Sequence, residues 1–591
     1  MKRSLITLVA VLAACVNPTA SAVNWVVDAN GNWTTDANWD AANPSGAGAV
    51  ADFSTLDISA DHTVTLDANR TVGTLRLGDT GGTVYSWTLS GANALTLQAS
   101  SGSATLAVNQ GTANLIAVPV TLNDPVTATV AATARLEISG NITGVAKDMW
   151  LPANFGTLRL SGNNSGWSGM LRMNGSNLGT IEVTNNNSLG TLNLNPYSYG
   201  GGPLRINNVS GGALTLPVGW TPYNDGGHTV NFGGGDMTFT GTWYNRDCGV
   251  TLAADAGVTV TMTGAAAIAP NTGGGSNYYS GPGTFVLAGD ASRRTAASYL
   301  NSGVRVGIAV DDAFGPSSVT LYTYNGGVEI FAVGGARSLA SQFPLSGHAY
   351  SSYANRYTFS GSNDLTFTGN MGFWQTNGDT RLNVTSTGLV TLAGNLTGTL
   401  EAGRSVIKEG AGTLVMTGSN SAYTRNLQID AGVLRAQDGT GLSPNCTLIF
   451  NGGVLEANGT VNRTLGTAGG QMRWAGNGGF SAFGGALTVD VNGDGADNLT
   501  WGSTAGFVPN NSTLIFGSTR ADNAVTFVDN IALGDANRTI AVADNALSEF
   551  DKAVLSGQIT GAGGLIKTGL GVLELDGDNT YSGDTLVSAG T

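Results

Sequence analysis

The chain has 591 residues, more than one hydrophobic core ordinarily holds, so it either divides into domains or grows by repetition. Glycine occurs 88 times, charged residues make up 11% and hydrophobic residues 41%, which argues against a disordered chain and favours an all-β repeat protein. The formal net charge of −14 argues against nucleic acid as a partner, because phosphate binding requires a basic surface.

Residues 1–22 have the three parts of an export signal. Lys2 and Arg3 form a basic start, Leu5 to Ala14 form an apolar stretch, and Ala20-Ser21-Ala22 is an A-x-A cleavage site. The apolar stretch is too short to span a bilayer. No later stretch has the ~18 uninterrupted apolar residues of a membrane helix. The sequence therefore predicts an exported chain without a transmembrane segment after processing.

A second interpretation of the same segment is a lipoprotein signal. Leu12-Ala13-Ala14-Cys15 matches a lipobox, in which Cys15 would become a lipidated N-terminus. We favour cleavage after Ala22, because Pro18 and the A-x-A triplet complete an ordinary signal. The lipoprotein at Cys15 remains the alternative.

Residues 23–60 contain three tryptophans, Trp25, Trp33 and Trp39. If exposed, their rings could stack on sugars, and if buried they would close the first turn of a repeat structure. We predict an N-terminal Trp-rich cap, because a stacked repeat protein needs its open end covered to stay soluble.

From residue 61 onward, short apolar strands recur between glycines. The pattern G-T-L-x-L occurs at Gly73–Leu77 and Gly156–Leu160, with a variant at Gly283–Leu287. Alternation places the apolar side chains of each strand on one face. One such strand cannot bury that face alone, but stacked copies can. We therefore predict a β-solenoid over residues 61–591.

A longer unit combines a turn, a strand, an Asn-Gly-Gly turn and a second strand. It runs from Phe314 to Glu329 and again from Leu442 to Glu456. Asn-Gly steps favour left-handed turn geometry, so a hairpin meander would also fit this unit. We prefer solenoid turns, because no helical pattern elsewhere supplies another layer. At ~22 residues and ~4.8 Å a turn, Cys248 and Cys446 would lie too far apart for a disulfide.

Two segments are plainly related, Val406–Val433 and Leu565–Thr591. They share ten residues at fixed spacing with one insertion before Tyr423, namely Ile407/Ile566, Lys408/Lys567, Gly410/Gly569, Gly412/Gly571, Leu414/Leu573, Gly418/Gly577, Asn420/Asn579, Tyr423/Tyr581, Ala431/Ala589 and Gly432/Gly590. This run resembles the autotransporter-associated β-strand repeat, also called the passenger-associated transport repeat. The Trp-rich start is also similar to the opening of exported proteins with such repeats.

The resemblance implies an elongated right-handed parallel β-helix displayed outside the cell, and it implies no particular ligand. A complete autotransporter ends in a translocating β-barrel, and the sequence pattern of one is missing before Thr591. We therefore expect the repeat region to be truncated at its C-terminus.

Catalytic signatures are scarce. The three histidines, His62, His228 and His348, lie outside any zinc or hydrolase motif, and turn or strand-edge positions suit them better than a triad. The carboxylate candidates are Asp311-Asp312 and Asp290 with Arg293-Arg294, which polar turns would also explain.

The turn Asp490-Val491-Asn492-Gly493-Asp494-Gly495 resembles a calcium loop. The bidentate glutamate expected at position 12 of such a loop is replaced by Trp501, and a solvent-facing turn is the simpler interpretation. Whether Asp490 to Gly495 bind calcium stays open at this point.

The sequence thus predicts an exported cell-surface or secreted β-helix protein with a structural, adhesin-like role. It predicts no catalytic residue, no cofactor and no metal ligand, so the protein is expected not to be an enzyme. The partner would be a surface or extracellular-matrix component, with polysaccharide among the candidates. The alternative is a carbohydrate-active β-helix that binds or cleaves extracellular polysaccharide.

Overall fold

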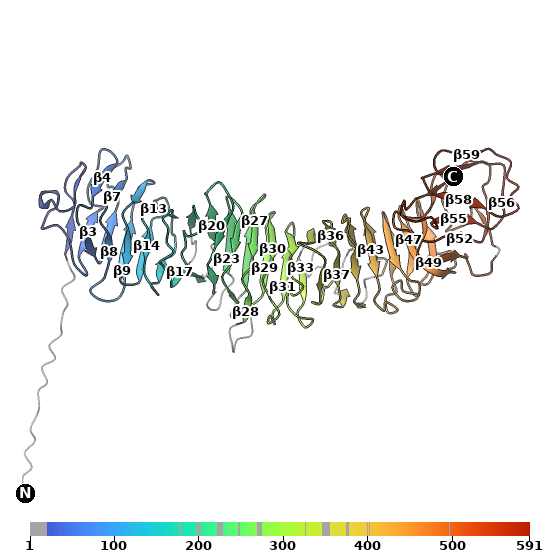
Figure 1. Ribbon diagram of the computed structural model, residues 1–591, viewed down its shortest axis with the longest axis horizontal. Coiled ribbons are helices and arrows are strands. Elements are labelled where there is room, and N and C mark those ends of the chain that lie inside the picture. The colour runs from blue at the N-terminus through green and yellow to red at the C-terminus, as the bar shows by residue number, and fades with distance from the viewer. Residues whose placement is uncertain are drawn as a thin grey trace, which may run out of the picture. The chain divides into compact units, whose positions relative to one another are not determined.

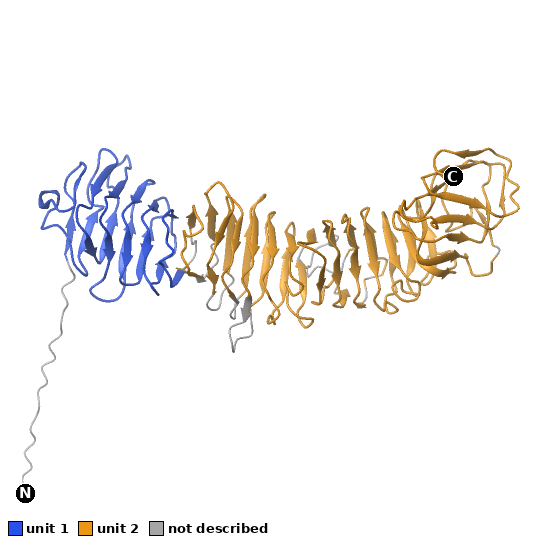
Figure 2. Cartoon of the chain, viewed as in Figure 1, with its two compact units in different colours: residues 1–172 blue, residues 173–591 orange. Residues whose placement is uncertain are grey.

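The computed structural model describes residues 21–175, 179–197, 203–221, 228–245, 249–268, 275–324, 327–345, 355–373, 378–398, 400, 402–495 and 497–591. The chain divides into two compact units, residues 1–172 and 173–591 (Figure 2). The predicted export signal lies almost wholly outside the described residues, as do His348 and Cys248.

Unit 1 consists of three sheets in which each strand pairs in parallel with its counterpart one turn later (Figure 1). Sheet 1 contains β1 (Ala22–Asn24), β3 (Val50–Phe53), β6 (Thr74–Leu77), β9 (Ala104–Val108), β12 (Val126–Val130) and β15 (Met149–Leu151). Sheet 2 contains β2 (Gly31–Asn32), β4 (His62–Thr65), β7 (Trp87–Ser90), β10 (Asn114–Ile116), β13 (Arg135–Ile138) and β16 (Thr157–Leu160). Sheet 3 contains β5 (Arg70–Val72), β8 (Leu95–Leu97), β11 (Val120–Leu122) and β14 (Ile142–Thr143).

The predicted tryptophan cap forms the first turns of unit 1. Trp25, Trp33 and Trp39 are buried and surround Phe53, with ring centroids 5.1 to 5.5 Å from it. The short 3₁₀ helix η1 (Asp36–Asn38) delivers Trp39 to this cluster. The tryptophans therefore close the core, as predicted, and offer no exposed rings to a sugar.

Unit 2 repeats the same construction. Within unit 2, β29 (Asn277–Ser280), β31 (Ser298–Asn301) and β33 (Leu321–Tyr324) are the last strands of the 13-stranded sheet that begins with β2, and the part of it in unit 2 is called sheet 4. Its sheet 5 includes β34 (Val328–Ala332), β42 (Ser405–Glu409), β44 (Asn426–Ile429), β46 (Thr447–Phe450) and β48 (Met472–Trp474).

Sheet 6 of unit 2 contains strands from both related segments. It includes β43 (Thr413–Met416), β45 (Val433–Ala436), β47 (Val454–Val461) and β49 (Gly478–Val489), and it then divides. One branch runs through β51 (Thr513–Phe516), β54 (Arg538–Val542), β57 (Leu565–Thr568) and β59 (Thr585–Val587). The other branch runs through β52 (Val525–Phe527), β55 (Lys552–Leu555) and β58 (Val572–Leu575). Beside them, sheet 7 contains β50 (Asn498–Thr500), β53 (Asn530–Ala532) and β56 (Ile559–Thr560).

Side chains alternate between core and surface along these strands. In β9 and β12 every second residue is buried, and these residues stack on their counterparts one turn later. One turn runs from Thr413 to Val433 and another from Thr74 to Thr105, so surface loops change the length of a turn while the core keeps its register. The parallel β-solenoid and its all-β character are confirmed, whereas the boundary near residue 60 stays a prediction.

The Asn-Gly-Gly turn at 451–453 is a corner of the solenoid and not a hairpin. It joins β46 of sheet 5 to β47 of sheet 6, and each of these strands pairs in parallel with other turns. A Cβ atom on Gly453 would lie 2.6 Å from the carbonyl oxygen of Gly432 on the preceding turn. Successive turns approach so closely at this corner that only glycine fits.

Candidate functional site

His62 and His228 lie in different units. His62 in β4 points its Nε2 at the Asp28 carboxylate, 2.6 Å away. The backbone N–H of Ser59, followed by His62, hydrogen-bonds Asp28 and lowers the pKa of its carboxyl to about 2. His228 is buried at the start of the strand His228–Gly233. Both positions belong to strands, as the sequence predicted for ordinary structural histidines.

Asp290 and Asp312 come together although they are distant in sequence. Their carboxyl groups hydrogen-bond each other. Hydrogen bonds from Ser292 and Asp312 lower the pKa of Asp290 to about 2, whereas burial and the charge of Asp290 raise the pKa of Asp312. A pair in direct contact is closer than the ~5 Å or more that separates the two carboxylates of a glycoside hydrolase.

The other residues of this candidate cluster have structural contacts. Asp311 lies in a turn and accepts the backbone N–H of Ser338 on the next turn of the solenoid, at 3.1 Å. Arg294 is buried and donates to the carbonyl oxygens of Ala296 and Ala297, each at 3.1 Å. Asp290 and Asp311 therefore accept backbone N–H groups at the turns of the solenoid.

The calcium-like turn contains a group that the sequence did not reveal. Trp501 is buried, so it cannot provide the missing ligand. Instead, Asp529 from the following turn of the solenoid lies beside Asp490 and Asp494, with one carboxylate oxygen of each within 4.8 Å of the others. Asp529 is far from Asp490 and Asp494 in the sequence, so the sequence alone did not identify it as a third ligand. Only the pairing register of β49 with β52 would have placed it beside them.

The lysine of the first related segment is buried and hydrogen-bonds two successive turns of the solenoid. Lys408 is 1% exposed, and its Nζ donates to the carbonyl oxygens of Glu409, Gly410 and Ala431 at 2.7 to 2.9 Å. Ala431 belongs to the turn that follows. Burial lowers the pKa of Lys408 to about 7.

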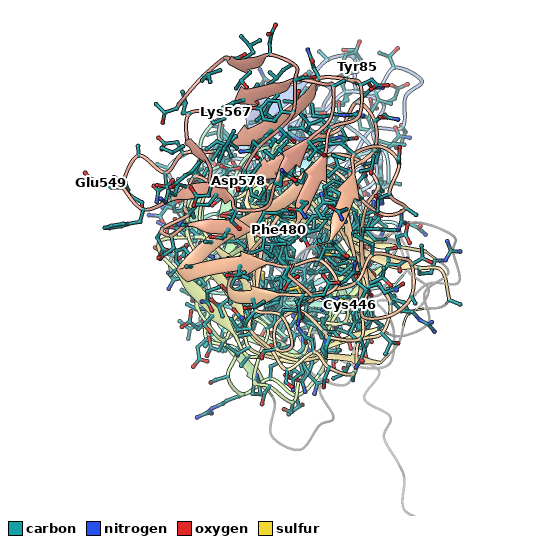
Figure 3. The ribbon with its side chains drawn as sticks, turned by 90° about the vertical axis from the view of Figure 1, so that its right-hand side faces the viewer. Tyr85, Cys446, Phe480, Glu549, Lys567 and Asp578 are labelled. Carbon is teal, nitrogen blue, oxygen red and sulfur yellow. The ribbon has the colours of Figure 1, made fainter. Side chains whose placement is uncertain are left out.

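The second segment uses its lysine in the same way. The buried Nζ of Lys567, labelled in Figure 3, donates to the carbonyl oxygens of Gly569 and Ala589 at 2.7 and 2.9 Å. The shared asparagines also link turns: Asn420 and Asn579 accept backbone N–H groups from the preceding turn, at 2.7 and 2.8 Å. The shared lysines and asparagines of the two segments thus hold one turn to the next.

A hollow of about 280 Å³ lies on sheet 6 at the first of these segments. Its floor is Glu456, which is fully buried and pairs with Arg435 at 2.5 Å. The Arg435 guanidinium lies 3.3 Å from the ring centre of Phe483. The remaining lining residues are Val415, Met416, Thr417, Ala436, Gln437, Thr440, Gly441, Ala457 and Asn458. The Glu456 carboxylate is paired with Arg435 Nε, whereas the buried Nη2 of Arg435 has no hydrogen-bond partner among the described residues.

A ladder of tyrosines follows the outer side of sheet 4. Tyr278, Tyr299 and Tyr322 are in register on β29, β31 and β33, and each is half-buried between fully buried neighbours. Their rings are stacked nearly parallel, with centroids 4.5 and 5.0 Å apart. Such a strip combines apolar ring edges with hydroxyl groups, a composition that protein and sugar contacts both use.

Stacked parallel turns, glycine corners and buried lysines that link turns define a repeat protein of the parallel β-solenoid class. The passenger-associated-transport-repeat family model matches residues 406–436 and 565–591, so the chain carries this repeat at both related segments, as predicted.

The chain is also similar to a curated protein, the adhesin BmaC autotransporter of Brucella suis biovar 1 (strain 1330). The two are 27% identical over 472 residues, which cover 70% of this chain and 13% of the adhesin. The chain thus matches only a small part of that much longer protein. No solved structure matches it. Within the described ranges, no helix is long and apolar enough to cross a membrane.

Proposed function

We propose that this chain is a passenger-type segment of a bacterial surface protein, and that it acts by adhesive contact without catalysis. The observation that carries the proposal is the transport repeat built into the solenoid at residues 406–436 and 565–591. The likeness to a stretch of an autotransporter adhesin supports it. A parallel solenoid suits the role, because it presents long rows of outward side chains on a rigid backbone.

The proposal includes export through residues 1–22. A fusion of these residues to a reporter that is active only outside the cytoplasm tests it, since the basic start and A-x-A site should direct secretion. Cys15→Ala separates the two kinds of signal: unchanged processing supports cleavage after Ala22, and retention of the precursor supports the lipoprotein.

Adhesion is tested with the purified chain coated on beads. We expect saturable binding to host cells or to immobilised matrix proteins, which an excess of soluble chain abolishes. The matched control is an unrelated β-solenoid of similar acidity. Binding no greater than that of the control, on every cell type and matrix protein tried, overturns the adhesin role.

Glycan binding is a second candidate, favoured by the tyrosine ladder. Tyr299 is the central ring and is stacked on both sides, so Tyr299→Ala interrupts the strip without emptying the core. A stacked aromatic pair contributes ~0.5–1.5 kcal/mol beyond its buried area, so we expect the fold to survive.

A polysaccharide array compares Tyr299→Ala with Phe331→Ala, a half-buried outward aromatic on β34. If the ladder binds glycans, only Tyr299→Ala loses signal. Equal signals from both variants contradict glycan binding at the ladder. Release of reducing ends from any bound polysaccharide would contradict the non-catalytic role.

A further inference from the structure

Two consecutive turns differ at one surface connection. Val489 at the end of β49 pairs with Phe527 of β52, and Asn498 at the start of β50 pairs with Asn530 of β53. The chain therefore needs residues 490–497 to make a connection that the next turn makes with residues 528–529. The surplus forms a loop at this point.

The loop folds against Asp529. The backbone N–H of Val491 donates to Asp529 Oδ2 at 2.8 Å. Left-handed backbone at Asn492, Gly493 and Gly495, with φ angles of 67°, 76° and 79°, curls the loop, and the Gly495 N–H donates to Asp490 Oδ1 at 3.0 Å. The curl brings Asp490 and Asp494 to the same place as Asp529.

The Asp529 carboxylate is buried without full compensation. Asp529 is only 2% exposed, and its Oδ1 has no hydrogen-bond partner among the described residues. A buried carboxylate oxygen without a partner is costly unless a cation or a donor completes it. Asp494 is exposed, so an ion can reach the cluster from solvent.

The charges around Asp529 have the same sign. Burial, together with the charges of Asp490 and Asp497, raises the pKa of Asp529 to about 6, against the backbone hydrogen bonds from Val491 and Asp497 that lower it. Burial and the charges of Asp494 and Asp490 also raise the pKa of Asp497. A divalent cation would relieve both the desolvation and the repulsion.

The donor set selects the kind of ion. Among the described His, Cys, Asp and Glu residues, those that converge here contribute carboxylate oxygens, which suit a hard cation and not zinc or copper. Calcium binds oxygens at ~2.3–2.6 Å in flexible geometry, so oxygens up to ~5 Å apart can share one ion, whereas magnesium requires a near-ideal octahedron at ~2.1 Å. The three carboxylate oxygens lie within 4.8 Å of one another, close enough to share one calcium ion.

We propose that Asp490, Asp494 and Asp529 form a calcium site that fastens the 490–497 loop to the next turn of the solenoid. Water and nearby carbonyl groups would complete the coordination. The site lies on a different part of unit 2 from the tyrosine ladder, and its test measures calcium binding without reference to adhesion.

Isothermal titration of the chelator-treated full chain with calcium chloride at pH 7.5 tests the proposal. We expect one site with a dissociation constant on the order of 10⁻⁴–10⁻³ M, the range of extracellular calcium modules. Asp529→Asn should weaken binding at least about tenfold, and Asp494→Asn should weaken it measurably. The matched control is Asp535→Asn, an exposed aspartate in a turn of the same region, which should bind like the unaltered chain.

Hydrogen exchange of the loop supplies a second readout, because bound calcium should slow exchange at residues 490–495 in the unaltered chain and in Asp535→Asn but not in Asp529→Asn. The proposal is overturned if the unaltered chain binds no calcium up to ~10 mM, if magnesium binds more tightly, or if Asp529→Asn binds equally well. Should Asp529→Asn fail to fold, the exposed Asp494→Asn decides between the same outcomes.

Discussion

Glu456 is a buried carboxylate of sheet 6 that makes one ion pair and two hydrogen bonds to hydroxyl groups. Its carboxylate is fully buried, accepts Arg435 Nε at 2.5 Å, and accepts the hydroxyl groups of Ser481 and Ser518 at 2.9 and 2.5 Å. Ser518 lies far along the chain, in the segment 517–523. We define this segment as the cover segment, because it lies over the outward row formed by Arg435, Glu456 and Ser481.

The cover segment has further attachments to the sheet, among them the Gly484 N–H donated to Asp522 Oδ1 at 2.7 Å and an antiparallel bridge between Ala482 and Asn523. Gly517 and Asp522 donate their backbone N–H groups to the carbonyl oxygens of Phe480 and Ala482, at 2.9 and 3.1 Å. Arg520 reaches back to the carbonyl oxygen of Thr387 at 2.8 Å. The Glu456 network is therefore one of several anchors of this segment.

Glu456→Ala should open the cover segment. Removing one partner of a buried pair costs ~3–5 kcal/mol, because the other charge stays buried without compensation. Arg435 keeps its contact with the Phe483 ring and is 15% exposed, which places the expected cost near the lower limit, at about 3 kcal/mol. Since ~1.4 kcal/mol corresponds to a factor of ten, local opening should become more than about 100-fold easier.

Hydrogen exchange with mass spectrometry measures this opening on peptides that cover 454–489 and 513–523. Two variants serve as controls. Glu574→Ala removes an exposed pair with Lys552 and should leave exchange unchanged. Replacing both Arg435 and Glu456 by Met should restore most of the protection, because an apolar pair leaves no buried charge. Protection in 513–523 that Glu456→Ala leaves within about threefold of the unaltered chain refutes the reasoning.

Three further predictions concern the core and corners. Burial lowers the pKa of Lys408 to about 7, so the free-energy cost of burying its charge is full below pH 7 and disappears as the pH rises toward 10. Between pH 7 and 10, chemical denaturation should therefore show the stability of the unaltered chain rising by about 3–5 kcal/mol relative to Lys408→Met. A stability difference that does not change with pH would contradict this. Gly453→Ala should destabilise the protein by more than ~1 kcal/mol in the same assay, because the new methyl group would clash with the Gly432 carbonyl oxygen. Gly212→Ala is the control and should be neutral, because a Cβ atom there meets no atom within 4 Å. Equal effects of the two variants would contradict the close approach of turns at Gly453. Trp33→Ala should cost ~3–5 kcal/mol and expose the cap to protease, and an unchanged digestion pattern would contradict a capping role.

The fold was predictable because it rests on a pattern that one sequence contains in full. Strict alternation in segments such as Thr157–Leu160, with glycine near each end, predicts a strand with one buried face. Two copies of a unit at fixed spacing then predict stacking. The tryptophan cap followed from a physical need of every solenoid, a covered end.

The candidate sites were not predictable, because they depend on which turn lies against which. Asp529 joins Asp490 only through the pairing of β49 with β52, and Asp312 meets Asp290 through a similar contact between successive turns. Loop lengths vary from turn to turn, so sequence spacing alone cannot align such residues. The roles of Lys408 and Lys567 were also hidden, since a charged residue inside a core contradicts the polarity pattern.

These buried lysines explain how the repeat keeps its register. A strand with alternating side chains can slip by two residues and still bury an apolar face, so alternation alone leaves the stacking ambiguous. A lysine among the buried positions removes the ambiguity, because its Nζ is satisfied only where the carbonyl oxygens of its own corner and of the next turn converge, as they do for Lys567. A slipped strand would bury the same ammonium group against apolar side chains, at a large desolvation cost. The motif that identifies the repeat is therefore also the device that fixes one turn upon the next.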